Sequence, residues 1–115
     1  ALGAGDAFAY WFTWATATFD GRLGSCHALE IPFVFGTMRR GGADLLLGLD
    51  APASLSTAMQ DAWLAFARGG HPDPEGVLGW EPYERERRAT LEFGDRIGPL
   101  DDPGSAARCL WDGVS

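Results

Sequence analysis

The stretch from Gly24 to Gly36 reads GSCHALEIPFVFG and sets one histidine, His27, between a glycine turn and a run of large apolar residues. Glu30 follows on the same turn, and Pro32 makes a long regular helix unfavourable here. This placement suits a general base in a loop, and it equally suits a structural core histidine. The residues around the stretch are needed to decide between the two.

Two strands are predicted around this histidine. Residues 7–16 (AFAYWFTWAT) are almost continuously aromatic and β-prone, which is typical of a central, parallel-type strand buried on both faces. Between this run and His27, Asp20-Gly21 and Gly24 favour a turn, because glycine adopts positive φ at little cost. Residues 89–93 (ATLEF) alternate as a short strand does.

The best-defined element is an amphipathic helix over residues 56–69. Ser56 or Thr57 could cap it, and Thr57 with Gln60 fits a capping box. Gly70 and Pro72 would end it. Residues 38–49 are expected to form a loop with a short apolar segment, and residues 105–111 a final helix capped by Ser105. The apolar stripe of the long helix comprises Met59, Ala62, Trp63 and Phe66.

Length and composition limit the function classes. The 115 residues are about one domain long, so residues 1–115 are expected to form a single unit. A net charge of -7 disfavours nucleic acid and anionic membranes as partners. All nine basic residues are Arg, and without Lys the chain supplies no Walker-type phosphate loop, Schiff base or pyridoxal phosphate site. No apolar run approaches the length of a membrane-spanning helix, so we expect a soluble protein, and the sequence leaves its cellular location open.

Side chains able to do chemistry are few. His27 and His71 are the only imidazoles, and His71 lies in turn-rich sequence typical of a solvated loop. A metal site from Cys26, His27 and Glu30 lacks tetrahedral zinc spacing, and a Cys26–His27 dyad is disfavoured because neighbouring extended residues point to opposite faces. No serine lies in a Gly-x-Ser-x-Gly elbow, so the chain offers no recognisable nucleophile.

Several motifs in order resemble one family. HALEIPFVFG at 27–36, preceded by DGRLG at 20–24 and the aromatic run 10–14, resembles the catalytic-histidine region of type B carboxylesterases, the cholinesterase-like branch of the α/β-hydrolases. The resemblance continues downstream over nearly the whole chain. Its further motifs are Leu55-Ser56-x-x-Met59, Ala62-Trp63, Phe66-Ala67, Gly70-x-Pro72, Trp80-x-Pro82-Tyr83, Arg88-x-Thr90 and Arg108-Cys109-Leu110-Trp111.

The resemblance implies a fold and a role. The chain looks like the C-terminal segment of an α/β-hydrolase fold, incomplete as a stand-alone sheet, and His27 matches the general acid/base histidine of a Ser-His-acid triad. The serine elbow, oxyanion glycines and triad acid of the family lie upstream, so Glu30 is expected to anchor the local turn instead. The implied substrate is a small carboxylic ester, with no cofactor and no metal.

Three departures from the family pattern stand out. Ser25 occupies a place usually held by alanine, and His71 stands where the family favours Asp or Asn. Cys109 resembles a position that is disulfide-bonded in some members, but the matching upstream cysteine is not in this chain. The oxidation state of Cys26 and Cys109 stays open.

Two alternatives to an enzyme completed by its own upstream part remain. One is a non-catalytic module that self-associates, at least as a dimer, because the isolated strand at residues 10–14 would leave backbone edges and aromatic surface free. The other is assembly with a separate N-terminal chain. On the enzymatic hypothesis the 115-residue chain alone is expected to be inactive.

Overall fold

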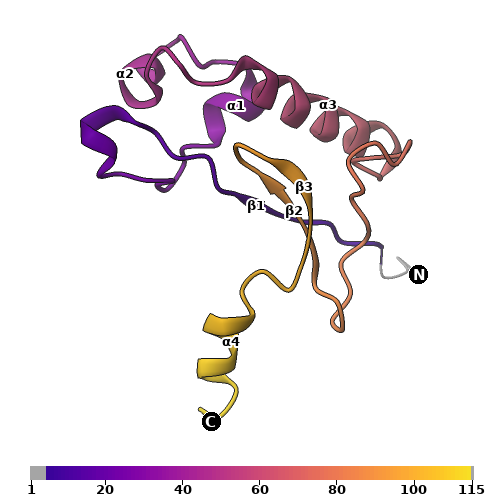
Figure 1. The fold of residues 1–115 in the computed structure, drawn as a ribbon. Coiled ribbons are helices and arrows are strands. Elements are labelled where there is room, and N and C mark those ends of the chain that lie inside the picture. Colours follow the sequence, from indigo (N-terminus) through magenta and orange to yellow (C-terminus); the bar gives the residue numbers. More distant parts are fainter. Residues whose placement is uncertain (1–4, 115) are drawn as a thin grey trace.

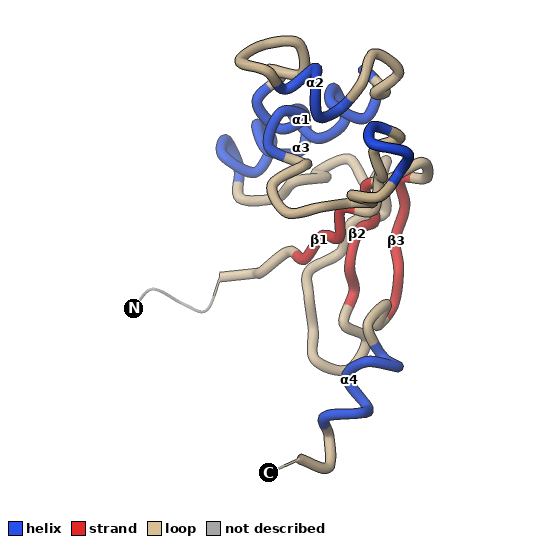
Figure 2. Tube along the Cα trace, turned by 90° about the vertical axis from the view of Figure 1, so that its left-hand side faces the viewer, coloured by secondary structure: helices blue, strands red, loops and turns tan. Residues whose placement is uncertain are grey.

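The computed structural model describes residues 5–114 and contains a three-stranded sheet with helices on one side of it (Figure 1). The sheet order is β1 (Ala9–Phe12), β2 (Ala89–Phe93), β3 (Ile97–Asp101); β1 and β2 are parallel, and β2 and β3 are antiparallel. In the sequence, four helices lie between β1 and β2: the short helix η1 (Thr18–Gly21), α1 (Ile31–Phe35), α2 (Ala43–Leu47) and α3 (Ala53–Gly69). The helix α4 (Ser105–Trp111) follows β3. In Figure 2, α1, α2 and α3 gather on one side of the strands, and α4 extends away on the other.

The aromatic run forms a parallel strand, but a shorter and more exposed one than predicted. β1 covers four residues and is an edge strand here, and Tyr10 and Trp11 are 39% and 46% exposed. Its pairing ends where β2 ends, with a last bond from Thr13 N to the Phe93 carbonyl oxygen (2.8 Å). Neighbouring residues of a strand point to opposite faces, so the exposure of both Tyr10 and Trp11 shows that neither face of β1 is fully buried. The predictions of a central strand and of burial on both faces were therefore wrong for residues 5–114.

Of the two strands of the β2–β3 hairpin, only β2 was predicted. β2 has the predicted bounds. Its residues alternate between buried and half-buried, and the side chains of Leu91 and Phe93 lie in the core. β3 was missed because Gly98 and Pro99 are poor strand formers. The outer edge of a sheet tolerates a proline, since its missing N–H need not join the hydrogen-bond ladder.

Helix α3 forms as predicted but begins three residues earlier, at Ala53, with Pro52 as its N-cap. The expected capping box is absent: Ser56 and Thr57 direct their hydroxyls to the carbonyl oxygens of Phe33 (2.7 Å) and Ala53 (3.2 Å). The helix ends at Gly69, and Gly70 caps it with a left-handed φ of 77°. Of the four residues of the predicted stripe, Met59 and Ala62 are buried and Trp63 is half-buried, but Phe66 is 49% exposed.

The two shorter helices, α1 and α2, follow the turn that carries His27. α1 tolerates Pro32 because the residue lies in the first turn, where the missing N–H costs nothing. α2 corrects the prediction of a loop at residues 38–49, since five of these residues are helical. Ser105 also does not cap α4, because it is the first helical residue and Gly104 holds the cap position.

One core joins these elements. Its fully buried side chains come from the turn before α1, from α1 itself, from α3 and from β2, and the indole of Trp14 packs on Phe33 with ring centroids 5.2 Å apart. Trp80 closes the core near the start of β1, where its Nε1 donates to the Ala9 carbonyl oxygen (3.0 Å). The core therefore links segments that are far apart in the sequence. Its most buried large side chains are Leu29, Phe33, Leu55, Met59, Leu91 and Phe93.

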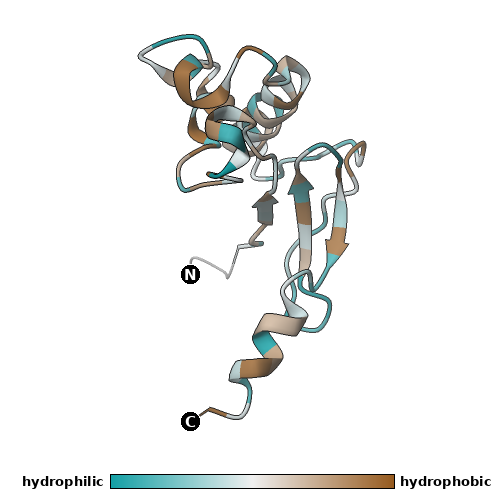
Figure 3. Ribbon diagram, turned by 60° about the vertical axis from the view of Figure 1, so that its left-hand side comes forward, coloured by the Kyte–Doolittle hydropathy of each residue, from teal (hydrophilic) through white to brown (hydrophobic). Residues whose placement is uncertain are grey.

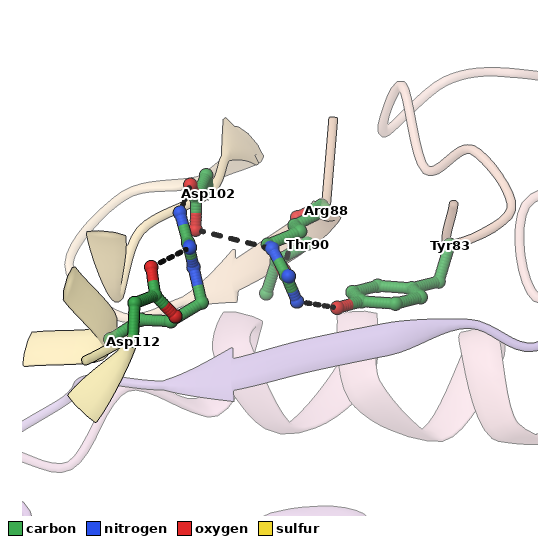
Figure 4. Close-up of polar contacts among 6 residues, drawn as sticks. Tyr83, Arg88, Thr90, Asp102 and Asp112 are labelled. Atoms are coloured by element: carbon green, nitrogen blue, oxygen red, sulfur yellow. Dashed lines mark hydrogen bonds and ion pairs between the residues drawn. The ribbon is translucent and has the colours of Figure 1, made fainter. Parts of the chain in front are cut away.

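Helix α4 stands apart from this core. Its Leu110 and Trp111 are 79% and 71% exposed, and Figure 3 shows apolar colour along this helix. Polar contacts hold it to the sheet: Arg108 Nη2 donates to Asp102 Oδ2 (2.6 Å), and Asp102 Oδ1 lies 3.9 Å from Arg88 Nε (Figure 4). Of the described helices, none is long and apolar enough to cross a membrane.

Candidate functional site

His27 lies in a turn that follows the continuation of β1 and leads directly into α1. Its side chain is exposed, and none of the hydrogen bonds among residues 5–114 involves its imidazole. An exposed imidazole without a partner can accept a proton at one nitrogen and present the other to a carboxylate. The geometry thus leaves both ring nitrogens available for chemistry.

The turn that carries His27 has a tightly folded backbone. Leu29 N donates to the Cys26 carbonyl oxygen and Ile31 N to the Ala28 carbonyl oxygen, both at 3.2 Å. Ala28 has a φ of 65°, in the left-handed region that residues with a Cβ rarely adopt. Such strain persists only where the surrounding structure imposes it, and it clusters at functional sites.

Core packing imposes this turn. Leu29 and Phe33 have no exposed surface, and the Phe12 ring packs on that of Phe33 with centroids 5.3 Å apart. Burying two such side chains contributes about 1.5–3 kcal/mol each. The turn is therefore pulled inward at Leu29, which leaves His27, two residues earlier, facing solvent.

The approach to the turn is tied to the strand segment before it. Thr16 N donates to the Gly24 carbonyl oxygen (3.1 Å), and Ser25 Oγ donates to the Phe12 carbonyl oxygen (3.1 Å). Between these segments, Phe19, Asp20 and Gly21 all have positive φ, as the predicted Asp-Gly turn requires of its glycine. The loop thus returns to the end of β1 before it reaches His27.

The neighbours of His27 do not complete a catalytic set. Cys26 packs against the core while His27 is exposed, so the two side chains diverge as the sequence predicted. Glu30 makes no hydrogen bond to His27 in the described part of the chain. The pKa of Tyr10 is raised mainly by burial and secondarily by the Glu30 carboxylate, which shows that the charge of Glu30 acts toward β1.

His71, the second imidazole, has a structural role and lies near the other end of β1. Its Nδ1 accepts a hydrogen bond from Asp73 N (3.0 Å), and its ring meets Phe8 edge-on with centroids 4.7 Å apart. Asp73 is buried, and its Oδ2 accepts from the backbone N–H groups of Leu78 and Trp80. The two histidines therefore do not form one site.

Two features were not found by sequence reasoning. The left-handed Ala28 has no sequence signal, because alanine rarely adopts positive φ and so does not predict it. A cavity of ~210 Å³ opens beside the start of β1, and no residue of the His27 turn lines it. The cavity is lined mainly by Phe8, Tyr10, Trp63, Phe66, Pro72 and Trp80.

Within residues 5–114, no three His, Cys, Asp or Glu side chains gather as a metal site requires.

Comparison with known proteins gives one consistent result. The sequence model described as the carboxylesterase family matches residues 3–109. The chain is 40% identical over 86 residues to the para-nitrobenzyl esterase of Bacillus subtilis (strain 168), covering 71% of this chain and 17% of that protein. It is 33% identical over 90 residues to the phenmedipham hydrolase of Pseudarthrobacter oxydans, covering 76% and 18%.

The solved structures agree. A PNB esterase superposes with a TM-score of 0.76 at 32% identity, over 90% of this chain and 21% of that chain. A carboxylesterase of Geobacillus stearothermophilus gives a TM-score of 0.75 at 32% identity, over 93% and 22%. The chain therefore has the fold of part of an α/β-hydrolase and spans about a fifth of the length of the proteins it matches.

Proposed function

Because the chain belongs to the carboxylesterase family, we propose that it supplies the general acid/base histidine of a carboxylic ester hydrolase, and that this histidine is His27. The observation that carries the proposal is the state of the His27 side chain. It is exposed and unpaired among the described residues, on a turn that two fully buried side chains hold in place.

In the proposed reaction, Nε2 of His27 takes the proton of a serine hydroxyl as its oxygen attacks the ester carbonyl carbon. The same proton then goes to the leaving alcohol as the carbonyl re-forms and the ester C–O bond breaks. In the second half, His27 takes a proton from water, whose oxygen attacks the acyl-enzyme, and returns it to the serine. An upstream carboxylate holds the Nδ1–H and stabilises the imidazolium.

The serine and the acid are proposed to lie upstream of this sequence, in the chain order serine, acid, histidine. Glu30 is not proposed as the acid, since it makes no hydrogen bond or ion pair with His27 among the described residues. The substrate is a small carboxylic ester, as the names of the related esterases suggest. Residues 1–115 alone are expected to hydrolyse nothing.

The test is hydrolysis of a short-chain nitrophenyl ester by residues 1–115 and by the polypeptide extended upstream to its serine elbow. In the extended protein, His27→Ala should lower kcat by at least about 10⁴-fold, as loss of a triad histidine does. His71→Ala removes the other imidazole and should leave kcat within a factor of about three, since turnover does not depend on a loop contact of this kind. Activity of residues 1–115 alone would mean that the chain holds its own nucleophile.

A second function is favoured by one observation, the free edge of β1 with Tyr10 and Trp11 partly exposed beside it. Isolated residues 1–115 are proposed to form at least a dimer through this edge. An upstream chain, covalently linked or separate, would cover the same edge and prevent self-association. Light scattering at micromolar concentration checks this, and a monomer in the absence of upstream sequence contradicts it.

Residues 1–115 are also proposed to form one structural unit, supported by a core that runs from Trp14 to Phe93. Thermal unfolding followed by Trp fluorescence and by far-ultraviolet circular dichroism should then give coincident transitions. Transitions at different temperatures for the two probes would show that residues 1–115 form more than one structural unit.

A further inference from the structure

We propose that Ser56 of α3 is a positioning residue for His27, an inference that rests on the proposed function. Ser56 does not touch His27. Its hydroxyl bonds the helix that continues from the His27 turn, and backbone hydrogen bonds connect that helix to the turn.

The His27 turn and α1 form one continuous hydrogen-bonded segment, residues 26–37, which we call the histidine segment. After the two turn bonds at Leu29 N and Ile31 N, the amides of Phe33 and Val34 both donate to the Glu30 carbonyl oxygen (3.0 Å). Thr37 N then donates to the Pro32 carbonyl oxygen (2.9 Å). A rotation of α1 is therefore transmitted to the turn that carries His27.

Ser56 holds the far end of this segment. Its Oγ donates to the Phe33 carbonyl oxygen at 2.7 Å, a short and buried bond, and the residue is 5% exposed. Gln60 Nε2 donates to the same Oγ (3.0 Å) and to the Ser56 carbonyl oxygen (3.3 Å). Because Gln60 occupies a lone pair of the hydroxyl, the hydroxyl proton is directed at Phe33.

The contact between α1 and α3 leaves little room to move. Gly36 ends α1 with a φ of 66°, and a Cβ at this position would lie 2.9 Å from Gln60 Oε1. Gln60 thus fills the space beside Gly36 while its amide nitrogen orients Ser56. Apolar packing of Leu29 and Phe33 sets the depth of the histidine segment, and the Ser56 bond sets its rotation about the α1 axis.

This restraint matters because His27 has no hydrogen bond of its own among residues 5–114. A general base must lie within about 2.6–3.2 Å of the proton it takes. A displacement of about 1 Å by a residue remote from the chemistry can cost about 100-fold in rate. Loss of the Ser56 hydroxyl should therefore slow proton transfer without removing any reacting group.

The test uses the ester-hydrolysing polypeptide that contains residues 1–115 and follows the burst of nitrophenol release. The burst rate constant reports the proton-transfer step, and the burst amplitude counts correctly folded sites. Ser56→Ala should lower the burst rate constant about tenfold and leave the amplitude unchanged, as a partial misplacement predicts. Ser56→Thr, which keeps the hydroxyl, should restore the rate constant to within a factor of about three.

Thr57→Ala is the matched control. It deletes the neighbouring hydroxyl on the same helix, which donates to Ala53 in an exposed position and does not contact the histidine segment. The rate constant should then stay at the wild-type value. If Ser56→Ala does not fold, Gln60→Met tests the proposal in its place. This substitution removes the amide that orients the Ser56 hydroxyl, and the burst rate constant should fall about threefold.

The outcomes separate this inference from the proposed function. If His27→Ala abolishes the burst but Ser56→Ala, or Gln60→Met in its place, leaves the rate constant unchanged, His27 is catalytic and the inference is wrong. A lower amplitude with an unchanged rate constant would assign Ser56 a purely structural role. If His27→Ala leaves the burst intact, the proposed function itself fails.

Discussion

The Ser25 hydroxyl is hydrogen-bonded to the Phe12 carbonyl oxygen at 3.1 Å, which joins the start of the histidine turn to the last residue of β1. The resemblance implies alanine at the Ser25 position, so on that expectation this bond is an addition to the family pattern. Ser25→Ala should lower the free energy of unfolding by about 0.5–1 kcal/mol, the usual contribution of such a bond. Urea denaturation measures this. Ser54→Ala, an exposed serine on α3 with no side-chain bond among the described residues, should change stability less.

Gly94 is predicted to be the glycine least able to accept a side chain. It is buried, and a Cβ there would clash with Thr13 Oγ1, which is itself held by a bond to Glu92 Oε2 (2.9 Å). Gly94→Ala should destabilise the fold by about 1–3 kcal/mol through overpacking. Gly98→Ala, in the same hairpin with open space at its Cβ position, should cost less than about 0.5 kcal/mol. Equal effects of the two substitutions would refute a steric cause.

Local signals explain what the sequence predicted well. The bounds of β2, the end of α3 at Gly69 and the whole of α4 follow from alternation, glycine and helical periodicity, which depend only on neighbouring residues. Ordered motifs added the family. Neither kind of signal required knowledge of the partners in space.

Long-range contacts explain the features that the sequence did not predict. Ser56 was predicted to cap α3, but its hydroxyl bonds a carbonyl 23 residues away, a partner that no local pattern could indicate. β1 was expected to be a central strand buried on both faces, but within residues 5–114 it pairs with one strand, and Tyr10 and Trp11 on its two faces are partly exposed. β3 contains Gly98 and Pro99 and is a strand only because β2 lies beside it.

Tyr10 should titrate at higher pH than an exposed tyrosine. Burial raises its pKa above the ordinary value of 10.0, and the Glu30 carboxylate raises it further. The folded chain then keeps a proton that the unfolded chain has lost, so stability should fall as pH rises above the unfolded pKa. In a Tyr83→Phe background, which leaves Tyr10 as the only tyrosine, tyrosinate absorbance follows this titration.

Glu30→Gln is the matched variant for this titration, since it removes the charge and keeps the shape. It should move the pKa of Tyr10 down but leave it above 10.0, because burial is the larger cause. A pKa that does not move would mean that Glu30 does not act on Tyr10.

His71 should be replaceable by asparagine more easily than by alanine. Its Nδ1 accepts a bond from the amide two residues later, which is the contact that an Asn or Asp side chain makes in an Asx-turn. This explains why histidine can stand where the resemblance implies Asp or Asn. His71→Ala should cost about 1–2.5 kcal/mol through the lost acceptor and the lost Phe8 contact.

His71→Asn keeps the acceptor and loses only the ring, so it should recover about 1 kcal/mol of that cost. Thermal or urea unfolding of the three proteins checks the order. Asparagine as damaging as alanine would show that the Phe8 contact, and not the turn bond, is what His71 provides.

Asp102 should control the attachment of α4. Its carboxylate lies between Arg108 of α4 and Arg88 before β2, and its hydrogen bond is the main cause that raises the pKa of Arg108 (Figure 4). Asp102→Asn removes the charge while suiting the local φ of 47°, which asparagine tolerates. Hydrogen exchange of the α4 amides should then accelerate about three- to tenfold, because that helix has few other contacts, while global stability changes by less than about 1 kcal/mol.

The neighbouring carboxylate provides the control for this experiment. Asp101 pairs with Arg87 at 3.2 Å on the exposed side of the hairpin and makes no ion pair with α4. Asp101→Asn should therefore leave exchange in α4 unchanged. High salt should weaken the Asp102–Arg108 pair and bring the wild-type exchange rates toward those of Asp102→Asn, because partly exposed charges are screened. Equal exchange in α4 for both variants would mean that the apolar side chains of the helix, and not this ion pair, hold it to the sheet.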